Sequence, residues 1–149
     1  MQPAALTGTS LVRQTPTVVV VDDEESIRTL LSRVLEQMGC TVHVAADADS
    51  ALAVMKSTPT HMALVDIRMP GHDGIWLIER ISRLYPAMAI VIATGVIDLD
   101  PHLTLRPGVV GYVVKPFVAE DIKKAVKHAL ASSGFPLPQS RLLPFIGRA

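Results

Sequence analysis

The stretch Val18-Val-Val-Val-Asp22-Asp23 decides how this chain of 149 residues is organised. Four β-branched apolar residues in a row are typical of a strand that is buried on both faces of a parallel sheet. Here the run leads directly into two carboxylates. Three other apolar runs also end in a polar residue, namely 63–65 before Asp66, 89–93 before Thr94 and 113–114 before Lys115.

These polar residues predict a single site if the four runs are parallel strands of one sheet. Open α/β sheets bind their ligands in the crevice outside the carboxyl ends of the strands. Asp22, Asp23 and Asp66 would repel one another there unless a cation lay among them. Mg²⁺ is bound through carboxylates, water and phosphate oxygens. The sequence therefore predicts a metal-dependent phosphoryl site that also contains the Thr94 hydroxyl and the Lys115 ammonium.

Helical patterns separate the apolar runs, and Gly39 is expected to end the first of them, which covers Ile27–Met38. The alternation predicts an α/β fold, with a parallel sheet covered by helices on both faces. We expect strands at 17–21, 41–45, 62–65, 89–93 and 111–114. Further helices are expected after a cap at Asp49 or Ser50 and up to Pro59, over 75–84 before Pro86, and over 122–130 before Gly134.

The ends of the chain and one internal segment depart from this pattern. Residues 95–108 contain Pro101 and Pro107, so the fourth helix is predicted to be short or disrupted. Residues 1–16 lack periodicity and are expected to form a flexible segment before a domain that spans 17–133. The proline-containing tail, 134–149, is either disordered or a segment that docks on the domain or on a partner.

Composition excludes several classes of protein. Fourteen basic and fourteen acidic side chains leave no net charge to attract nucleic acid or an anionic membrane. No run approaches the ~20 apolar residues that a membrane-spanning helix needs, and residues 1–16 lack the apolar core of a signal peptide. The one cysteine, Cys40, fits a reducing compartment. We therefore expect a cytoplasmic protein with no nucleic-acid or membrane partner.

Five motifs of this chain occur in a characteristic order and spacing: Val18–Glu24, Leu64–Gly71, Asp73-Gly74, Thr94 and Gly111–Phe117. Together they resemble the receiver domain of two-component response regulators, over residues from about 17 to 132 of this chain. The resemblance implies a flavodoxin-like (βα)5 fold, which is a doubly wound sheet of five parallel strands in the order 2-1-3-4-5.

The resemblance also implies a role for each polar residue of the predicted site. Asp66, whose ionised carboxylate is a competent nucleophile, would accept a phosphoryl group from a sensor histidine kinase or a histidine phosphotransfer protein. Lys115 would bind a phosphoryl oxygen, and Thr94 would hydrogen-bond the attached group. Mg²⁺, or Mn²⁺, would be bound by Asp22, Asp23, Asp66 and the backbone carbonyl of Arg68.

A switch and a single-domain mode of signalling follow from the same resemblance. Tyr112 would move inward when Thr94 shifts, and the Lys115–Pro116 peptide bond would be cis. The chain would signal to a protein target that the sequence does not name, as a monomer or weak homodimer. It would be no enzyme beyond catalysing its own phosphorylation and slow dephosphorylation.

Other residues of these motifs are interpreted as structural. Glu24 is expected only to open the first helix, where an acidic residue favours the positive N-terminus. Trp76 is expected to pack in the core, and His72 to be a solvated loop histidine. The histidines show no spacing typical of a zinc site.

Three alternatives stay open. One is a scaffold of the same fold whose switch is idle. The second is a phosphohydrolase with an aspartyl nucleophile, although such enzymes have a second acid where this chain has Arg68. The third is a flavin or dinucleotide protein, which the acidic run 22–25 disfavours because it replaces the glycine-rich phosphate turn.

The resemblance places Arg68 and Val96 at positions that tune loss of the phosphoryl group by admitting or excluding the attacking water. We therefore expect Arg68→Ala to change the rate at which the phosphorylated chain loses its phosphoryl group. Intact mass followed over time would measure that rate. An unchanged rate would rule out a role for the Arg68 side chain.

Overall fold

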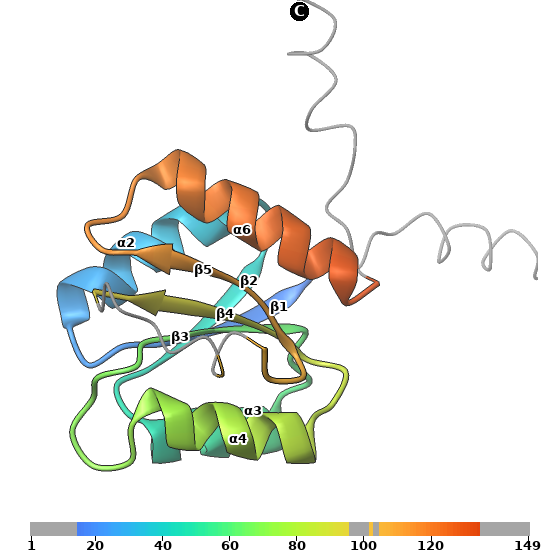
Figure 1. The fold of residues 1–149 in the computed structure, drawn as a ribbon. Coiled ribbons are helices and arrows are strands. Elements are labelled where there is room, and N and C mark those ends of the chain that lie inside the picture. Colours follow the sequence, from blue (N-terminus) through green and yellow to red (C-terminus); the bar gives the residue numbers. More distant parts are fainter. Residues whose placement is uncertain (1–14, 96–101, 103–104, 135–149) are drawn as a thin grey trace, which may run out of the picture.

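The computed structural model describes residues 15–95, 102 and 105–134, which form one parallel sheet of five strands in the order β2-β1-β3-β4-β5 (Figure 1). This order confirms the predicted flavodoxin-like, doubly wound topology. The strands are β1 (Thr17–Val21), β2 (Thr41–Ala45), β3 (Met62–Val65), β4 (Ala89–Thr94) and β5 (Val109–Val114).

Two layers of helices cover the sheet, as predicted from the alternation of the sequence. Figure 1 shows α2 (Glu25–Gln37) and α6 (Ala119–Ser132) on one face. On the other face lie α3 (Ala48–Ser57) and α4 (Gly74–Leu84). None of the helices among the described residues is long and apolar enough to cross a bilayer.

The valine run of β1 is buried on both faces, which explains why it is apolar without alternation. Val18 and Val20 pack in the core under α2 and α6, whereas Val19 and Val21 pack in the core under α3 and α4. All four are at most 1% exposed. Full burial of such a side chain contributes about 1.5–3 kcal/mol. By contrast, Val44 lies on the edge strand β2 and is 47% exposed. The free energy gained by burying strand side chains therefore comes mostly from the central strands.

Among the element boundaries that differ from those expected, two have a clear local cause. The N-cap of α3 is Asp47, whose carboxylate accepts a hydrogen bond from the Ser50 N–H at 2.7 Å, so the expectation of Asp49 or Ser50 as the cap was wrong. Asp47 has the extended backbone that an N-cap requires, whereas Asp49 and Ser50 already lie inside the helix. Strand β5 begins at Val109 rather than Gly111, because Ile90 N–H donates to the Gly108 carbonyl at 2.7 Å and starts the pairing earlier.

Most residues of the expected short fourth helix lie outside the described part of the chain. Residues 1–14 and 135–149, which belong to the two predicted terminal segments, also lie outside it. The stretch just before β5 is described and is tied to α4. Arg106 forms an ion pair with Glu79 at 2.6 Å, and the Ser82 hydroxyl donates to the Pro107 carbonyl at 2.8 Å. These contacts fix the entry into β5 against the helix that follows β3.

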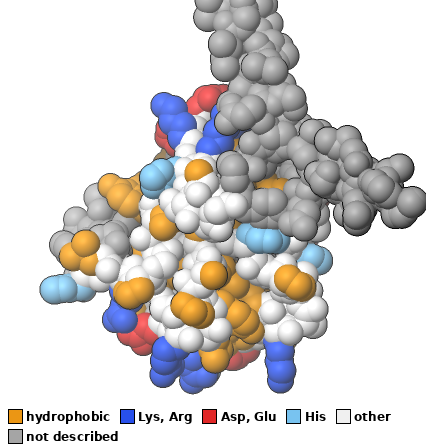
Figure 2. Space-filling model, turned by 90° about the vertical axis from the view of Figure 1, so that its right-hand side faces the viewer, with side chains coloured by type: hydrophobic (Ala, Val, Ile, Leu, Met, Phe, Trp, Pro, Cys, Tyr) orange, Lys and Arg blue, Asp and Glu red, His pale blue; other side chains and the backbone are white. Residues whose placement is uncertain are grey.

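Figure 2 views the molecule from the right-hand side of Figure 1, the end at which the strands begin. Basic side chains gather there along the lower edge, over α3 and α4. Exposed members on these helices are Lys56, Arg80 and Arg83. The polar residues that follow the strands lie at the other end of the sheet.

The start of α4 is packed directly against the backbone that follows β3. Gly74 N–H donates to the Ile67 carbonyl at 2.8 Å, and the Asp73 carboxylate caps the helix by accepting from the Trp76 N–H at 3.0 Å. A Cβ at Gly74 would overlap the backbone carbonyl of Asp66 and lie 2.7 Å from Cα of Ile67. The helix can approach this closely only because residue 74 has no side chain.

We expect Gly74→Ala to lower the free energy of unfolding by about 1–3 kcal/mol, since forcing an extra methyl group into a packed site costs that much. Gly111→Ala is the matched control, because a Cβ at Gly111 would meet no atom within 4 Å. Urea unfolding followed by Trp76 fluorescence would measure both variants. If Gly74→Ala were as stable as the unmodified protein, the close packing at the start of α4 would be refuted.

Candidate functional site

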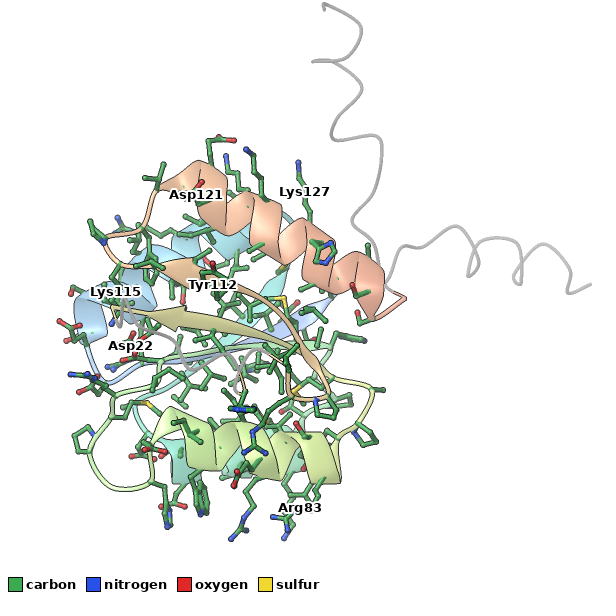
Figure 3. The ribbon with its side chains drawn as sticks, in the orientation of Figure 1. Asp22, Arg83, Tyr112, Lys115, Asp121 and Lys127 are labelled. Carbon is green, nitrogen blue, oxygen red and sulfur yellow. The ribbon has the colours of Figure 1, made fainter. Side chains whose placement is uncertain are left out.

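The polar residues predicted from the ends of the apolar runs lie at one end of the sheet. Asp22, Asp66 and Lys115 follow β1, β3 and β5 directly, and Thr94 is the last residue of β4. Figure 3 labels Asp22 and Lys115 at this end. Backbone hydrogen bonds continue the pairing into the site, from Asp66 N–H to the Val21 carbonyl at 2.9 Å and from Lys115 N–H to the Thr94 carbonyl at 2.8 Å.

Three carboxylates form a cluster that suits a hard divalent cation. Asp22, Asp23 and Asp66 each offer one oxygen, and these oxygens lie within 4.8 Å of one another. Asp22 and Asp66 are buried, whereas Asp23 is exposed, so the cluster is open to solvent on one side. One oxygen of Asp22 accepts from the Glu24 N–H at 2.9 Å, which leaves Oδ2 facing the cluster. Carboxylate oxygens are the ligands that Mg²⁺ takes in proteins, so this donor set fits it.

The Lys115 ammonium lies among the carboxylates. Its Nζ is 3.0 Å from Asp22 Oδ2 and 3.5 Å from Asp66 Oδ2, and the side chain is 18% exposed. The Asp22 pair is a close charge contact without the alignment of a hydrogen bond. The Lys115–Pro116 peptide bond is cis, as the resemblance predicted.

The electrostatic environment shifts the pKa of both partners upward. Burial raises the pKa of the Asp66 carboxyl, and the neighbouring Asp22 charge raises it further, whereas Lys115 opposes the shift. Burial lowers the pKa of Lys115, but its contacts with Asp22, Asp66 and Glu24 outweigh this and raise it overall. Lys115 is therefore a cation at neutral pH, and the site combines a buried carboxylate with a fixed positive charge.

The remaining predicted residues lie on β4, on β5 and in the loop after β3. Thr94 is buried at the end of β4, and Tyr112 lies on the neighbouring strand β5, where its side chain is 55% exposed. In the register of these strands Tyr112 pairs with Ile92, two residues before Thr94. Arg68 is exposed in the loop after β3, where it lines an open hollow of about 510 Å³ with Met69 and Asp73.

Two residues that the sequence analysis did not place at the site contact it. Glu24 Oε1 is 3.3 Å from Lys115 Nζ. The Arg28 guanidinium donates to the Asp22 carbonyl at 2.8 Å. The only sequence signal for Arg28 was its place one helical turn after Glu24, since residues four apart share a helix face.

The aromatic pair in the following loop and helix lies beside the site without joining it. The His72 ring stacks on Trp76, with ring centroids 3.7 Å apart, and Nδ1 lies 3.2 Å from the Asp49 carboxylate. Arg80 covers the Trp76 ring at 4.4 Å. Trp76 packs against the core under α3 and α4, as expected, and His72 is half-exposed but packed rather than simply solvated.

We expect Asp66→Asn to stabilise the metal-free protein, increasingly so as the pH rises above about 4. Because the pKa of Asp66 is higher in the fold than in the unfolded chain (about 3.9), ionisation above that value favours unfolding. The difference in unfolding free energy between Asp66→Asn and the unmodified protein should approach about 1.4 kcal/mol for each unit by which the fold raises the pKa of Asp66. Urea unfolding in the presence of EDTA measures it, with Asp121→Asn on the exposed start of α6 as control. A gap that narrows with rising pH would contradict the burial argument.

Comparison with known proteins gives the same assignment for most of the chain. The sequence model of the response regulator receiver domain matches residues 18–127. The transcriptional regulator NtrC of Salmonella typhimurium is 35% identical over 115 residues, which cover 76% of this chain and 24% of that protein. DctD of Rhizobium meliloti, a regulator of C4-dicarboxylate transport, is 31% identical over 115 residues, or 76% of this chain and 25% of that protein. The chain thus spans about a quarter of the length of these relatives.

Solved structures similar to this chain support the same assignment. A CheY-like receiver domain from Methanospirillum hungatei has a TM-score of 0.76 and 29% identity, and the match covers 81% of this chain and 98% of that one. NtrX from Brucella abortus has a TM-score of 0.75 and 30% identity over 81% of this chain and 28% of that one. The chain belongs to the response regulator receiver domain family, whose members are regulatory switches that interact with histidine kinases and bind Mg²⁺ at an acidic pocket.

Proposed function

We propose that this chain is the phosphoacceptor of a two-component phosphorelay and that Asp66 is the residue phosphorylated. The donor would be the phosphohistidine of a sensor histidine kinase or of a histidine phosphotransfer protein. One observation carries the proposal: the Asp66 carboxylate lies 3.5 Å from the Lys115 ammonium and clusters with Asp22 and Asp23 at the open edge of the sheet. A nucleophile, a fixed cation and a cation-binding cluster are the parts that phosphoryl transfer requires.

In the proposed transfer, an Asp66 oxygen forms a bond to phosphorus as the phosphorus–nitrogen bond of the donor breaks. The electron pair of that bond goes to the donor nitrogen. The Lys115 ammonium binds a phosphoryl oxygen and offsets the charge gathered there. The Thr94 hydroxyl, at the end of the adjacent strand, donates a hydrogen bond to the attached phosphoryl group.

Asp22, Asp23 and Asp66, with the backbone carbonyl of Arg68, would hold Mg²⁺ or Mn²⁺. The bound ion would neutralise phosphoryl oxygens in the transition state. The exposed position of Asp23 leaves a path by which the ion and the donor reach the buried carboxylates. The exposure of Asp23 therefore supports a site to which the metal ion and the phosphoryl donor bind together.

Phosphorylation would then shift a two-state equilibrium through Thr94 and Tyr112. In the structure the Tyr112 ring is 55% exposed, so it contributes little to the core in this state and can be buried in the other. The output would be contact with a protein partner, with the receiver catalysing only its own phosphorylation and dephosphorylation. A cytoplasmic location and a monomeric or weakly dimeric state stay predictions.

Phosphorylation with a small-molecule donor tests the proposal. We expect acetyl phosphate or phosphoramidate with Mg²⁺ to add one phosphoryl group to the intact protein, and we expect EDTA or Asp66→Asn to abolish the addition. Intact mass spectrometry detects the adduct, and Trp76 fluorescence reports the accompanying change in the neighbouring loop.

Asp121→Asn is the matched control, because Asp121 is an exposed carboxylate at the start of α6. It should be phosphorylated like the unmodified protein. No adduct, or an adduct that survives Asp66→Ala, would support an idle scaffold of the same fold. Sustained turnover of small phosphate esters would instead support a phosphohydrolase.

A further inference from the structure

Glu24 occupies the N-cap position of α2 but does not cap the helix through its side chain. N-cap side chains normally accept a hydrogen bond from a backbone N–H of the first turn. The Glu24 carboxylate instead reaches across to β5, where Oε1 lies 3.3 Å from Lys115 Nζ. This use of the side chain is not explained by helix formation.

The three carboxylates around Lys115 differ in their freedom to move. Asp22 and Asp66 are buried and held by the ends of β1 and β3. The Glu24 side chain is 59% exposed and one methylene longer than an aspartate. The ammonium donates hydrogen bonds to Glu24 and Asp66 and makes a charge contact with Asp22 Oδ2 at 3.0 Å, so carboxylates surround it on three sides. A phosphoryl oxygen that binds Lys115 would take the place of one of these carboxylates.

We infer that Glu24 is a positioning residue that holds the Lys115 ammonium while Asp66 is unphosphorylated and must release it when a phosphoryl group arrives. Glu24 is the partner that can leave, since the other two are fixed by the sheet. This inference rests on the proposed function of Asp66. It predicts that Glu24 slows phosphorylation by competing with the incoming phosphoryl oxygen.

Two variants of Glu24 distinguish the effect of its contact with Lys115 from a general repulsion between its negative charge and an anionic phosphoryl donor. Glu24→Gln removes the charge. Glu24→Asp keeps the charge but shortens the side chain by one methylene, which draws the carboxylate away from Lys115, and an N-cap aspartate favours a hydrogen bond to the first turn of its own helix. Glu25→Gln removes the same charge from the neighbouring exposed residue in the first turn of α2.

The experiment measures the second-order rate constant of phosphorylation by phosphoramidate with Mg²⁺. We expect both Glu24 variants to react about two- to fivefold faster than the unmodified protein, which is the range for a partly exposed ion pair. We expect Glu25→Gln to react at the unmodified rate. Equal acceleration by Glu24→Gln and Glu25→Gln with no effect of Glu24→Asp would overturn the inference in favour of a simple charge effect.

A second measurement needs neither donor nor metal. The nitrogen-15 NMR signal of the Lys115 ammonium should shift in Glu24→Gln and Glu24→Asp and stay in place in Glu25→Gln. Thermal melting by circular dichroism checks that each variant is folded. An unmoved Lys115 signal in both Glu24 variants would refute the contact itself.

The outcomes distinguish the inference from the function on which it rests. If the unmodified protein takes up no phosphoryl group, the proposed function fails, whatever the NMR signal shows. If it is phosphorylated through Asp66 but both Glu24 variants react at the unmodified rate, only the role of Glu24 fails.

Discussion

One ammonium group placed among carboxylates is the interaction on which the rest of the site depends. Asp22 and Asp66 are buried at the edge of the sheet, where an unpaired negative charge is costly. The Lys115 ammonium lies within 3.5 Å of both and lowers that cost. The compensation is incomplete, because the pKa of Asp66 remains raised. The charge that remains uncompensated is what makes the cluster receptive to a divalent cation.

The sheet supplies the precision that such an arrangement needs. Residues 22, 66 and 115 are far apart in the sequence, yet each follows a strand whose neighbours are fixed by backbone hydrogen bonds. The start of α4 closes against the Asp66 backbone at Gly74 and limits its movement. By contrast, Asp23, Glu24 and Arg68 are exposed. The site therefore has a buried inner half, built on strands, and an exposed outer half, built on loops and a helix start.

Sequence patterns located the central strands β1, β3 and β4 well because burial on both faces leaves no alternative to an apolar run. These patterns located element boundaries less well where several neighbouring residues suit the same position. In the run 47–50 two aspartates and a serine are all good helix caps, and tertiary packing of Ala48 and Ala51 selected Asp47. The early start of β5 depends on pairing between Ile90 and Gly108, which is set by the partner strand rather than by residues 109–110 themselves.

The strand order was expected only from the family resemblance, whereas the sequence alone determined the parallel α/β architecture, the edge at which the polar residues gather and the identity of Asp22, Asp23, Asp66, Thr94 and Lys115 as candidates. These follow from local patterns, since each polar residue is adjacent to its own strand. Only the tertiary structure decided that Glu24 faces Lys115 rather than its own helix and that Gly74 must have no side chain. Both depend on contacts between segments distant in the chain, and a local pattern carries no information about such distances.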